Sequence, residues 1–396
     1  MGAKVLKIIC VEFENLNHFK QGNFKVDFIA TDRVLKNSEL YNVSGNIFSQ
    51  STIGFIGLNA TGKTTVLRLL NIALSVIIDN KDLNSLNMNE MIVSGTKMIV
   101  TFFYNGVYYQ LESVIEYKVN SDGRRKFFYG EEILRKKYPN RVKFRKNISD
   151  FSDEVCSEIT TRSKLSEDSL IQYLDDGKSI VSPLIRDNES FLSDNLFSSY
   201  ANIATPLGKV PSEILEVFDE SIETLIIEEQ PTKDNQSGWK LKFKNTPIGY
   251  SNPNALALNL IISTGTISGQ ELIQKAILAL KSGGYLIVDE LEMHLNKEIV
   301  RTILNIFKST LTNPYGACLI FSIHYAELLD VESLNRKDNI YITRKSNHLL
   351  SVSKFSDEIS RNDYKKSEIF LSNALGGTAP KNKAIQRLRD YICKLL

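Results

Sequence analysis

The sequence predicts an α/β fold with N-terminal β-hairpins and a helical insertion. Two short apolar runs, "YLIVDE" (285–290) and "ACLIFSIH" (317–324), are typical of buried parallel strands. Apolar residues recur at helical spacing around 267–281 and 296–310, before and between those runs. Such alternation of strands and helices is the pattern of an α/β core.

Composition places the chain among ordinary globular proteins. Its 396 residues, 42% hydrophobic and 24% charged, suit one large α/β domain with an insertion, or two domains. The net charge of +2 indicates nothing about partners, and the four cysteines form no C-x-x-C pair that would suggest a zinc ribbon. No apolar run is long enough to span a bilayer, and no signal peptide is recognisable. We therefore expect a cytoplasmic protein without a membrane partner.

The first elements are a hairpin and a phosphate-binding loop. Residues 4–30 alternate apolar and polar side chains around a polar turn, which predicts a β-hairpin. "GLNATGKTT" (57–65) then fits G-x-x-x-x-G-K-[ST] between a strand-like and a helix-like segment. In such loops backbone N–H groups surround the phosphates, the lysine reaches the β- and γ-phosphates, and the hydroxyl ligates Mg²⁺. The residues expected to bind ATP are Gly57, Asn59, Gly62, Lys63, Thr64 and Thr65.

A second hairpin and a helical insertion follow. Residues 97–117 predict a hairpin that turns at Asn105-Gly106. "SEILEVFDESIETLII" (212–227) places apolar residues at helical spacing, and 166–174 and 190–204 look similar. We predict three parts: 1–130 as the N-terminal half of the core, 131–240 as the helical insertion, and 241–396 as the C-terminal half.

Two strands of the C-terminal half end in side chains suited to phosphate chemistry. Asp289 and Glu290 end one strand, where Asp289 can complete the Mg²⁺ site and Glu290 can act as general base for water. The next strand ends at His324, where a γ-phosphate sensor would sit. The structural alternatives are a solvated acidic turn and a histidine that satisfies a backbone group.

A glycine-containing turn precedes the helix at 267–281. Two registers compete as an anion site at the helix N-terminus: Ser263-Thr264-Gly265-Thr266 and Ser268-Gly269-Gln270. A plain helix cap, which either serine could supply, is the alternative.

Together, the phosphate loop, glycine turn, Asp-Glu strand and His324 resemble the ABC-type ATPases in content and order. The resemblance is closest to the RloA/AbiLi-like group of soluble ATPases, related to OLD proteins and to SMC and DNA-repair ATPases. That group carries an S-S-G-T signature shortly before the acidic strand, and Ser263 precedes Asp289 by 26 residues (289 − 263). The resemblance therefore selects Ser263 to Thr266 as the signature, although Thr264 replaces the usual serine.

The resemblance implies a homodimer or higher oligomer that encloses ATP and Mg²⁺. One phosphate loop would face the signature turn of the other chain, with Ser263 and Gly265 at the γ-phosphate. Asn296 falls where the loop after the acidic strand would cross that interface, but an exposed helix cap explains it equally well. Gln110 is a candidate for the glutamine that usually follows the second hairpin in that family, and a strand-exposed glutamine is its alternative.

The resemblance further implies a sensor or switch that controls a partner effector, a nuclease or toxin, in anti-phage defence by abortive infection. The sequence shows no second catalytic set, so the effector chemistry is expected from a separate protein. The alternatives are an autonomous DNA-repair ATPase, the ATPase subunit of a membrane transporter, and a small-molecule kinase.

Residues 124–147 form a basic segment. They contain ten Lys or Arg and two acids, a local charge of +8 (10 − 2) that suits DNA or RNA binding. Residues 211–229 contain seven acids and no base. The two segments could therefore pair with each other, within the chain or across a dimer, instead of binding nucleic acid.

Overall fold

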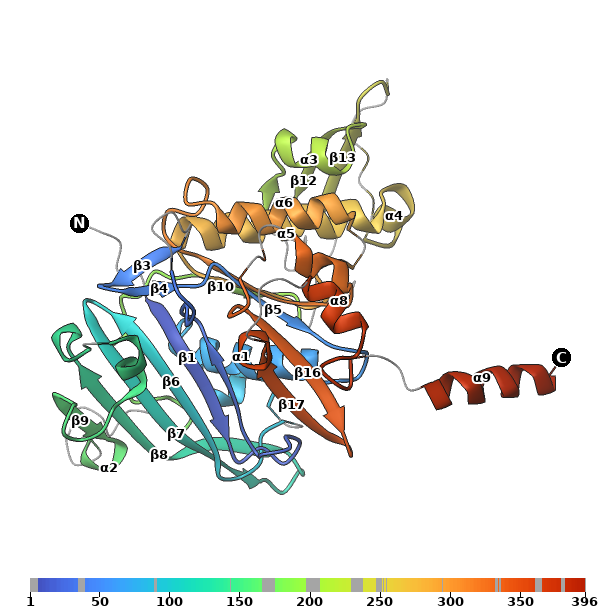
Figure 1. Cartoon of the computed structure of the whole chain (residues 1–396). Coiled ribbons are helices and arrows are strands. Elements are labelled where there is room, and N and C mark those ends of the chain that lie inside the picture. Colours follow the sequence, from blue (N-terminus) through green and yellow to red (C-terminus); the bar gives the residue numbers. More distant parts are fainter. Residues whose placement is uncertain are drawn as a thin grey trace.

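The computed structural model describes residues 6–34, 40–88, 91–142, 144–165, 175–196, 207–228, 238–246, 251, 253, 255–293, 295–331, 334, 336–359, 365–378 and 382–395. These residues form a mixed α/β structure with two six-stranded sheets (Figure 1). None of the described helices is both long and apolar enough to cross a membrane.

The first sheet is antiparallel, in the order β2-β1-β6-β7-β8-β9. Both predicted hairpins lie in it and are confirmed. The second turns at Asn105 (φ 48°) and Gly106 (φ 78°), as a two-residue hairpin turn requires. The strands are β1 (Lys7–Glu14), β2 (Phe24–Asp27), β6 (Thr96–Tyr104), β7 (Val107–Val119), β8 (Arg125–Lys137) and β9 (Glu158–Thr161).

The second sheet has the order β10-β14-β15-β5-β16-β17 and is parallel except for β17. The two predicted parallel strands, β14 and β15, are confirmed. Because parallel strands share one carboxyl edge, the loops after β14, β15, β5 and β16 all begin at the same edge of this sheet. The strands are β5 (Thr52–Ile56), β10 (Leu192–Asp194), β14 (Tyr285–Val288), β15 (Cys318–Ile323), β16 (Ile340–Ser346) and β17 (Leu349–Lys354).

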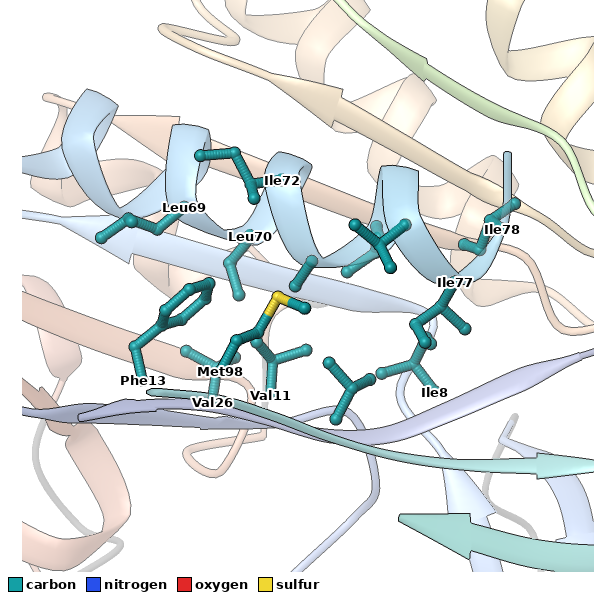
Figure 2. Packing of buried hydrophobic residues seen from close by; sticks show 14 of the residues in the cluster. Ile8, Val11, Phe13, Val26, Leu69, Leu70, Ile72, Ile77, Ile78 and Met98 are labelled. Carbon is teal, nitrogen blue, oxygen red and sulfur yellow. The ribbon is translucent and has the colours of Figure 1, made fainter. Parts of the chain in front are cut away.

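The helix α1 (Lys63–Ile77) lies between the two sheets. Figure 2 shows Leu70 and Ile77 of this helix packed above Val11 and Met98 of the antiparallel sheet. Alternate residues of β14 divide the interior, because successive side chains of a strand point to opposite faces. Tyr285 and Ile287 join the cluster around α1, whereas Leu286 and Val288 join the cluster formed with α5 (Thr264–Ser282) and α6 (Lys297–Lys308).

The helical character predicted for 131–240 is wrong in the described residues, which are mostly strands and irregular segments. Of 212–227, only α3 (Ser212–Phe218) is helical, and β12 (Ile222–Ile227) is a strand. The helix ends because the Asp219 carboxylate accepts a hydrogen bond from the Ser221 N–H (3.0 Å), a local bond that competes with the helix. In the segment 190–204, Leu192–Asp194 is strand β10, and 197–204 lies outside the described residues, as does 166–174.

A small three-stranded sheet packs beside α5. It consists of β11 (Gly208–Lys209), β12 and β13 (Trp239–Phe243), and it shares a core with α3, α4 (Ala255–Ile261) and α5. The other described elements are the hairpin β3 (Tyr41–Ser44) and β4 (Ile47–Ser49), four short 3₁₀ segments η1 (Leu83–Ser85), η2 (Pro139–Arg141), η3 (Arg145–Ser149) and η4 (Ala326–Asp330), and the helices α2 (Arg162–Leu165), α7 (Phe355–Glu358), α8 (Lys366–Leu371) and α9 (Asn382–Leu395).

Candidate functional site

A cavity of about 550 Å³ lies at the carboxyl edge of the parallel sheet. The loop that joins β5 to α1 lines it, together with residues at or after the ends of β14, β15 and β16. The predicted residues Asn59, Gly62, Lys63, Thr64, Thr65, Glu290 and His324 all line it, together with His18, Ala60, Thr61, Arg68, Met91, Lys345, His348 and Leu350.

Two glycines are needed for the shape of the loop. A Cβ atom on Gly57 would lie 2.3 Å from the Thr343 hydroxyl oxygen, so no larger residue fits beside β16. Gly62 has a φ of 91°, and a Cβ there would lie 2.6 Å from Leu350. Glycine adopts this conformation without strain, which lets α1 begin immediately at Lys63.

The Lys63 ammonium folds back over the loop. It donates to the carbonyl oxygens of Gly57 (2.8 Å) and Leu58 (3.1 Å) and lies 3.2 Å from His324 Nδ1. Burial lowers the pKa of Lys63, while the carboxylates of Asp289, Glu290 and Glu292 oppose that shift. The cation is thus placed among acceptors at the N-terminus of a helix, where anions bind favourably.

The residues predicted to hold Mg²⁺ are in direct contact. The Thr64 hydroxyl donates to Asp289 Oδ2 at 2.5 Å. A hydroxyl and a carboxylate are the oxygen donors that Mg²⁺ prefers, and this ion usually takes few protein ligands beside phosphate and water. Among the described residues, no group of three or more His, Cys, Asp or Glu side chains is placed to hold a metal ion. The pair fits Mg²⁺.

Glu290 and His324 lie side by side on the lining of the cavity. Glu290 Oε1 lies 3.1 Å from His324 Nε2, and both side chains are partly exposed, at 44% and 28%. Glu290 has a φ of 53°, in the left-handed region that costs a non-glycine residue conformational energy. Backbone strain of this kind is concentrated at functional sites.

Sequence reasoning missed Ser322, which connects both acids to β15. Its buried hydroxyl donates to Asp289 Oδ1 (2.5 Å) and accepts the Glu290 N–H (2.8 Å). Its carbonyl oxygen accepts the Leu291 N–H at 3.0 Å. A serine two residues before His324 was the available signal, but its role depends on β14 and β15 being neighbours.

Asn195 and Glu292 also hold the predicted residues in place. Asn195 follows β10, and its side-chain oxygen accepts the Asp289 N–H (2.7 Å) while its amide donates to the Asp289 carbonyl (3.3 Å). The Glu292 carboxylate accepts the His324 N–H, and burial raises the pKa of Glu292. No sequence pattern identified either residue, and Asn195 was missed because β10 itself was not predicted.

The predicted signature turn lies at the start of α5. Ser263 is the N-cap, and its hydroxyl oxygen accepts the Thr266 N–H at 3.0 Å. The competing register is inside the helix: Gly269 contacts Phe218, where a Cβ would lie 2.1 Å from the ring, and Gln270 is fully buried. The helix begins at Thr264, slightly earlier than the start around residue 267 that the sequence predicted. The turn does not contribute to the described lining of the phosphate-loop cavity.

The two remaining candidates, Gln110 and Asn296, have contacts that suit structural roles. Gln110 lies on β7 opposite Thr101 and Arg135, and it is not among the described residues that line the cavity. Asn296 caps α6, since its side-chain oxygen accepts the Glu298 N–H at 2.9 Å. These contacts favour the strand and cap interpretations that the sequence left open.

Much of the basic segment 124–147 forms β8, where several of its cations have internal partners. Arg135 pairs with Glu112 (2.8 Å), and the buried Lys137 ammonium donates to the carbonyls of three residues between 147 and 150. In the acidic segment, Glu223 and Glu228 pair with lysines of β13. Within the described residues, then, these acids are paired with their neighbouring strand.

Comparisons with known proteins give little further guidance. No protein-family model matches the chain, and no curated protein matches it. One similar solved structure is that of the recombination mediator protein RecF with ATP, of the RecFOR pathway. The match covers 89% of this chain and 99% of that chain, at 10% identity and a TM-score of 0.39. A likeness of this degree carries no argument about activity or partners, and assignment to the RloA/AbiLi-like group stays a prediction from the sequence.

Proposed function

We propose that this chain is a Mg²⁺-dependent ATPase that binds ATP across the carboxyl edge of its parallel sheet. The observation that carries the proposal is the convergence of Lys63, Thr64, Glu290 and His324 on the lining of one cavity, with Asp289 bonded to the Thr64 hydroxyl beside it. They come from loops after three adjacent strands, β5, β14 and β15. A cation, a hard-oxygen pair and a carboxylate–imidazole pair are the groups that phosphoryl transfer to water requires.

Each residue has a role that follows from its contacts. Lys63 can exchange its loop carbonyls for phosphate oxygens without moving far. Thr64 and Asp289 would hold Mg²⁺, which neutralises charge on the phosphates when bound. Glu290 can accept a proton from the attacking water, and His324, bonded to both Glu290 and Lys63, keeps the acid and the cation aligned.

The ATPase is proposed to close as a homodimer. The chain contains one phosphate loop and one signature turn, and that turn is absent from the described lining of the loop's own cavity. Thr264 and Gly265 are partly exposed at the N-terminus of α5, so a second chain can present them to the γ-phosphate. ATP that contacts both chains favours the closed state, and hydrolysis releases it.

Control of an effector protein in anti-phage defence is the finer proposal, and it rests on the resemblance of the motifs. Co-purification with the product of a neighbouring gene, in an ATP-dependent manner, tests it. DNA or RNA contact by residues 124–147 is a separate proposal. Hydrolysis that DNA stimulates without a protein partner would favour the DNA-repair alternative instead.

The direct test of the ATPase is binding and hydrolysis of MgATP by wild type and by Lys63→Ala. Removing the charge-assisted bonds to phosphate should weaken binding by roughly tenfold to a hundredfold or more and abolish turnover. Glu327→Gln, an exposed acid near His324, is the control and should behave as wild type. Equal turnover by wild type and Lys63→Ala would refute the proposal.

A further inference from the structure

The strand order distinguishes two ends of the cavity, one on each side of β5. Glu290 and His324 follow β14 and β15, which lie on one side of β5. Lys345 and His348 belong to β16 and to the turn after it, on the other side of β5, and line the same cavity. If a triphosphate places its γ end at Glu290 and His324, the rest of the molecule extends over the phosphate loop toward the β16–β17 turn.

We propose that His348 in this turn and His18 in the β1–β2 loop form the nucleoside subsite, with Lys345 beside them. The inference rests on the proposed ATPase function. It names the residues that would bind the nucleoside, which is the part of the ligand that the phosphate loop does not hold. Its ligand class is a nucleoside triphosphate, as opposed to an inorganic polyphosphate.

The turn is attached firmly to the phosphate loop and to the β1–β2 loop. The Leu350 N–H donates to the His18 carbonyl, and the Lys20 N–H donates to the Leu350 carbonyl, both at 2.8 Å. The Leu350 side chain packs on Gly62 of the phosphate loop. His18 and His348 are therefore carried by two segments that are bonded to each other through Leu350, which also contacts the phosphate loop.

The backbone of the turn is unusual for its sequence. Asn347 (φ 50°) and His348 (φ 66°) both adopt the left-handed conformation that a two-residue hairpin turn needs. Glycine is the common residue at the second position, because a larger side chain is strained there. A histidine in its place is exposed and lines the cavity, so the strain is consistent with a functional role.

The side chains at this end suit a base and a ribose. Imidazole rings stack on nucleobases and exchange hydrogen bonds with their edges. Met91, which also lines the cavity, offers an apolar surface, and the exposed Lys345 offers three N–H donors to ribose or α-phosphate oxygens. On the other side of β5, Glu290 and His324 supply the carboxylate and imidazole proposed to face the γ-phosphate.

The test compares two ligands, the β,γ-imido analogue of ATP and inorganic triphosphate, each with Mg²⁺, by titration calorimetry. The double variant His18→Ala/His348→Ala should bind the analogue roughly tenfold or more weakly, as expected for loss of base stacking, and bind triphosphate as wild type does. Asn347→Gly is the matched control, because this neighbouring side chain is not in the described lining; it should retain wild-type affinity for both ligands. Thermal melting of each variant establishes that it is folded.

Several outcomes would overturn the inference. They are an equal loss of affinity for both ligands in the double variant, no loss for either, or wild-type binding of triphosphate as tight as that of the analogue. Lys63→Ala separates the two proposals, since it should weaken both ligands. If wild type binds neither ligand, the proposed ATPase function fails, and the nucleoside subsite fails with it.

Discussion

The two edges of the parallel sheet each carry a buried lysine in contact with carbonyl groups, yet their surroundings differ. At the amino edge, the Lys7 ammonium donates to the carbonyls of Gly283, Tyr315 and Gly316, each at 2.7 Å. These carbonyls lie just before β14 and β15. At the carboxyl edge, Lys63 contacts two loop carbonyls and His324, and it lines a cavity.

Burial alone does not distinguish these lysines. Burial lowers the pKa of Lys7 to about 7 and also lowers the pKa of Lys63. The two lysines differ in whether a ligand can replace their hydrogen-bond partners. Lys7 uses all three donors on fixed carbonyls, whereas Lys63 faces open space where phosphate oxygens can replace its partners. A buried charge thus indicates a binding site when its bonds can be exchanged for bonds to a ligand.

At the carboxyl edge, a large effect on turnover with ATP binding retained is expected for Glu290→Gln. The amide keeps the shape of the side chain but cannot accept the proton from water, so turnover should fall ~10²–10⁴-fold while ATP stays bound. Stopped turnover with retained ATP should also accumulate the closed dimer, measured by sedimentation with and without ATP. Turnover at the wild-type rate would show that Glu290 is not the general base.

Ser322→Ala should have the next largest effect. Its hydroxyl orients Asp289 and the backbone of Glu290, and loss of such outer contacts typically costs ~10–100-fold in metal affinity or activity. The Mg²⁺ concentration for half-maximal hydrolysis should therefore rise. A purely structural serine would lower the melting temperature and leave that Mg²⁺ concentration unchanged.

Lys7→Met tests the contrast from the other edge. It leaves the carbonyls of Gly283, Tyr315 and Gly316 without a donor, and a buried unsatisfied group costs about 1–3 kcal/mol. Urea unfolding should show lower stability than wild type, with ATP binding by the folded protein retained. Lys63→Met should do the reverse, losing ATP binding with little loss of stability. Loss of ATP binding in folded Lys7→Met would contradict the claim that only the lysine at the carboxyl edge serves the nucleotide site.

The smallest effect concerns pH. The pKa of Lys7 is about 7 in the folded protein and near 10.5 when unfolded, so the unfolded state binds more protons between those values. Wild-type stability should accordingly rise with pH relative to Lys7→Met between about pH 7 and 9, by at most ~1.4 kcal/mol per unit. Parallel stability curves for the two proteins over this range would contradict the low pKa.

The sequence revealed some residues of the candidate site and not others. The phosphate loop, Asp289, Glu290 and His324 were found because each belongs to a short motif at a strand end. Ser322 and Asn195 were missed because their roles depend on which strands are neighbours, and β10 lies next to β14 although residues 195–284, 90 in all, lie between them in the sequence.

The wrong helix at 212–227 has a local cause. Its apolar residues fit helical spacing, but "IETLII" (222–227) is rich in β-branched residues that favour strands. The Asp219 bond to the Ser221 N–H separates the two halves. Pairing with β13 on one side and β11 on the other then decides the outcome, and neither partner strand was predicted.

The most direct test of the central claim is a crystal structure of Glu290→Gln with MgATP. The account predicts Mg²⁺ between Thr64 and Asp289, the γ-phosphate beside Lys63 and His324, and the nucleoside toward His348. A second chain should place Thr264 and Gly265 against the same phosphate. ATP bound outside this cavity, or lying in it with its base at residue 290, would contradict the account.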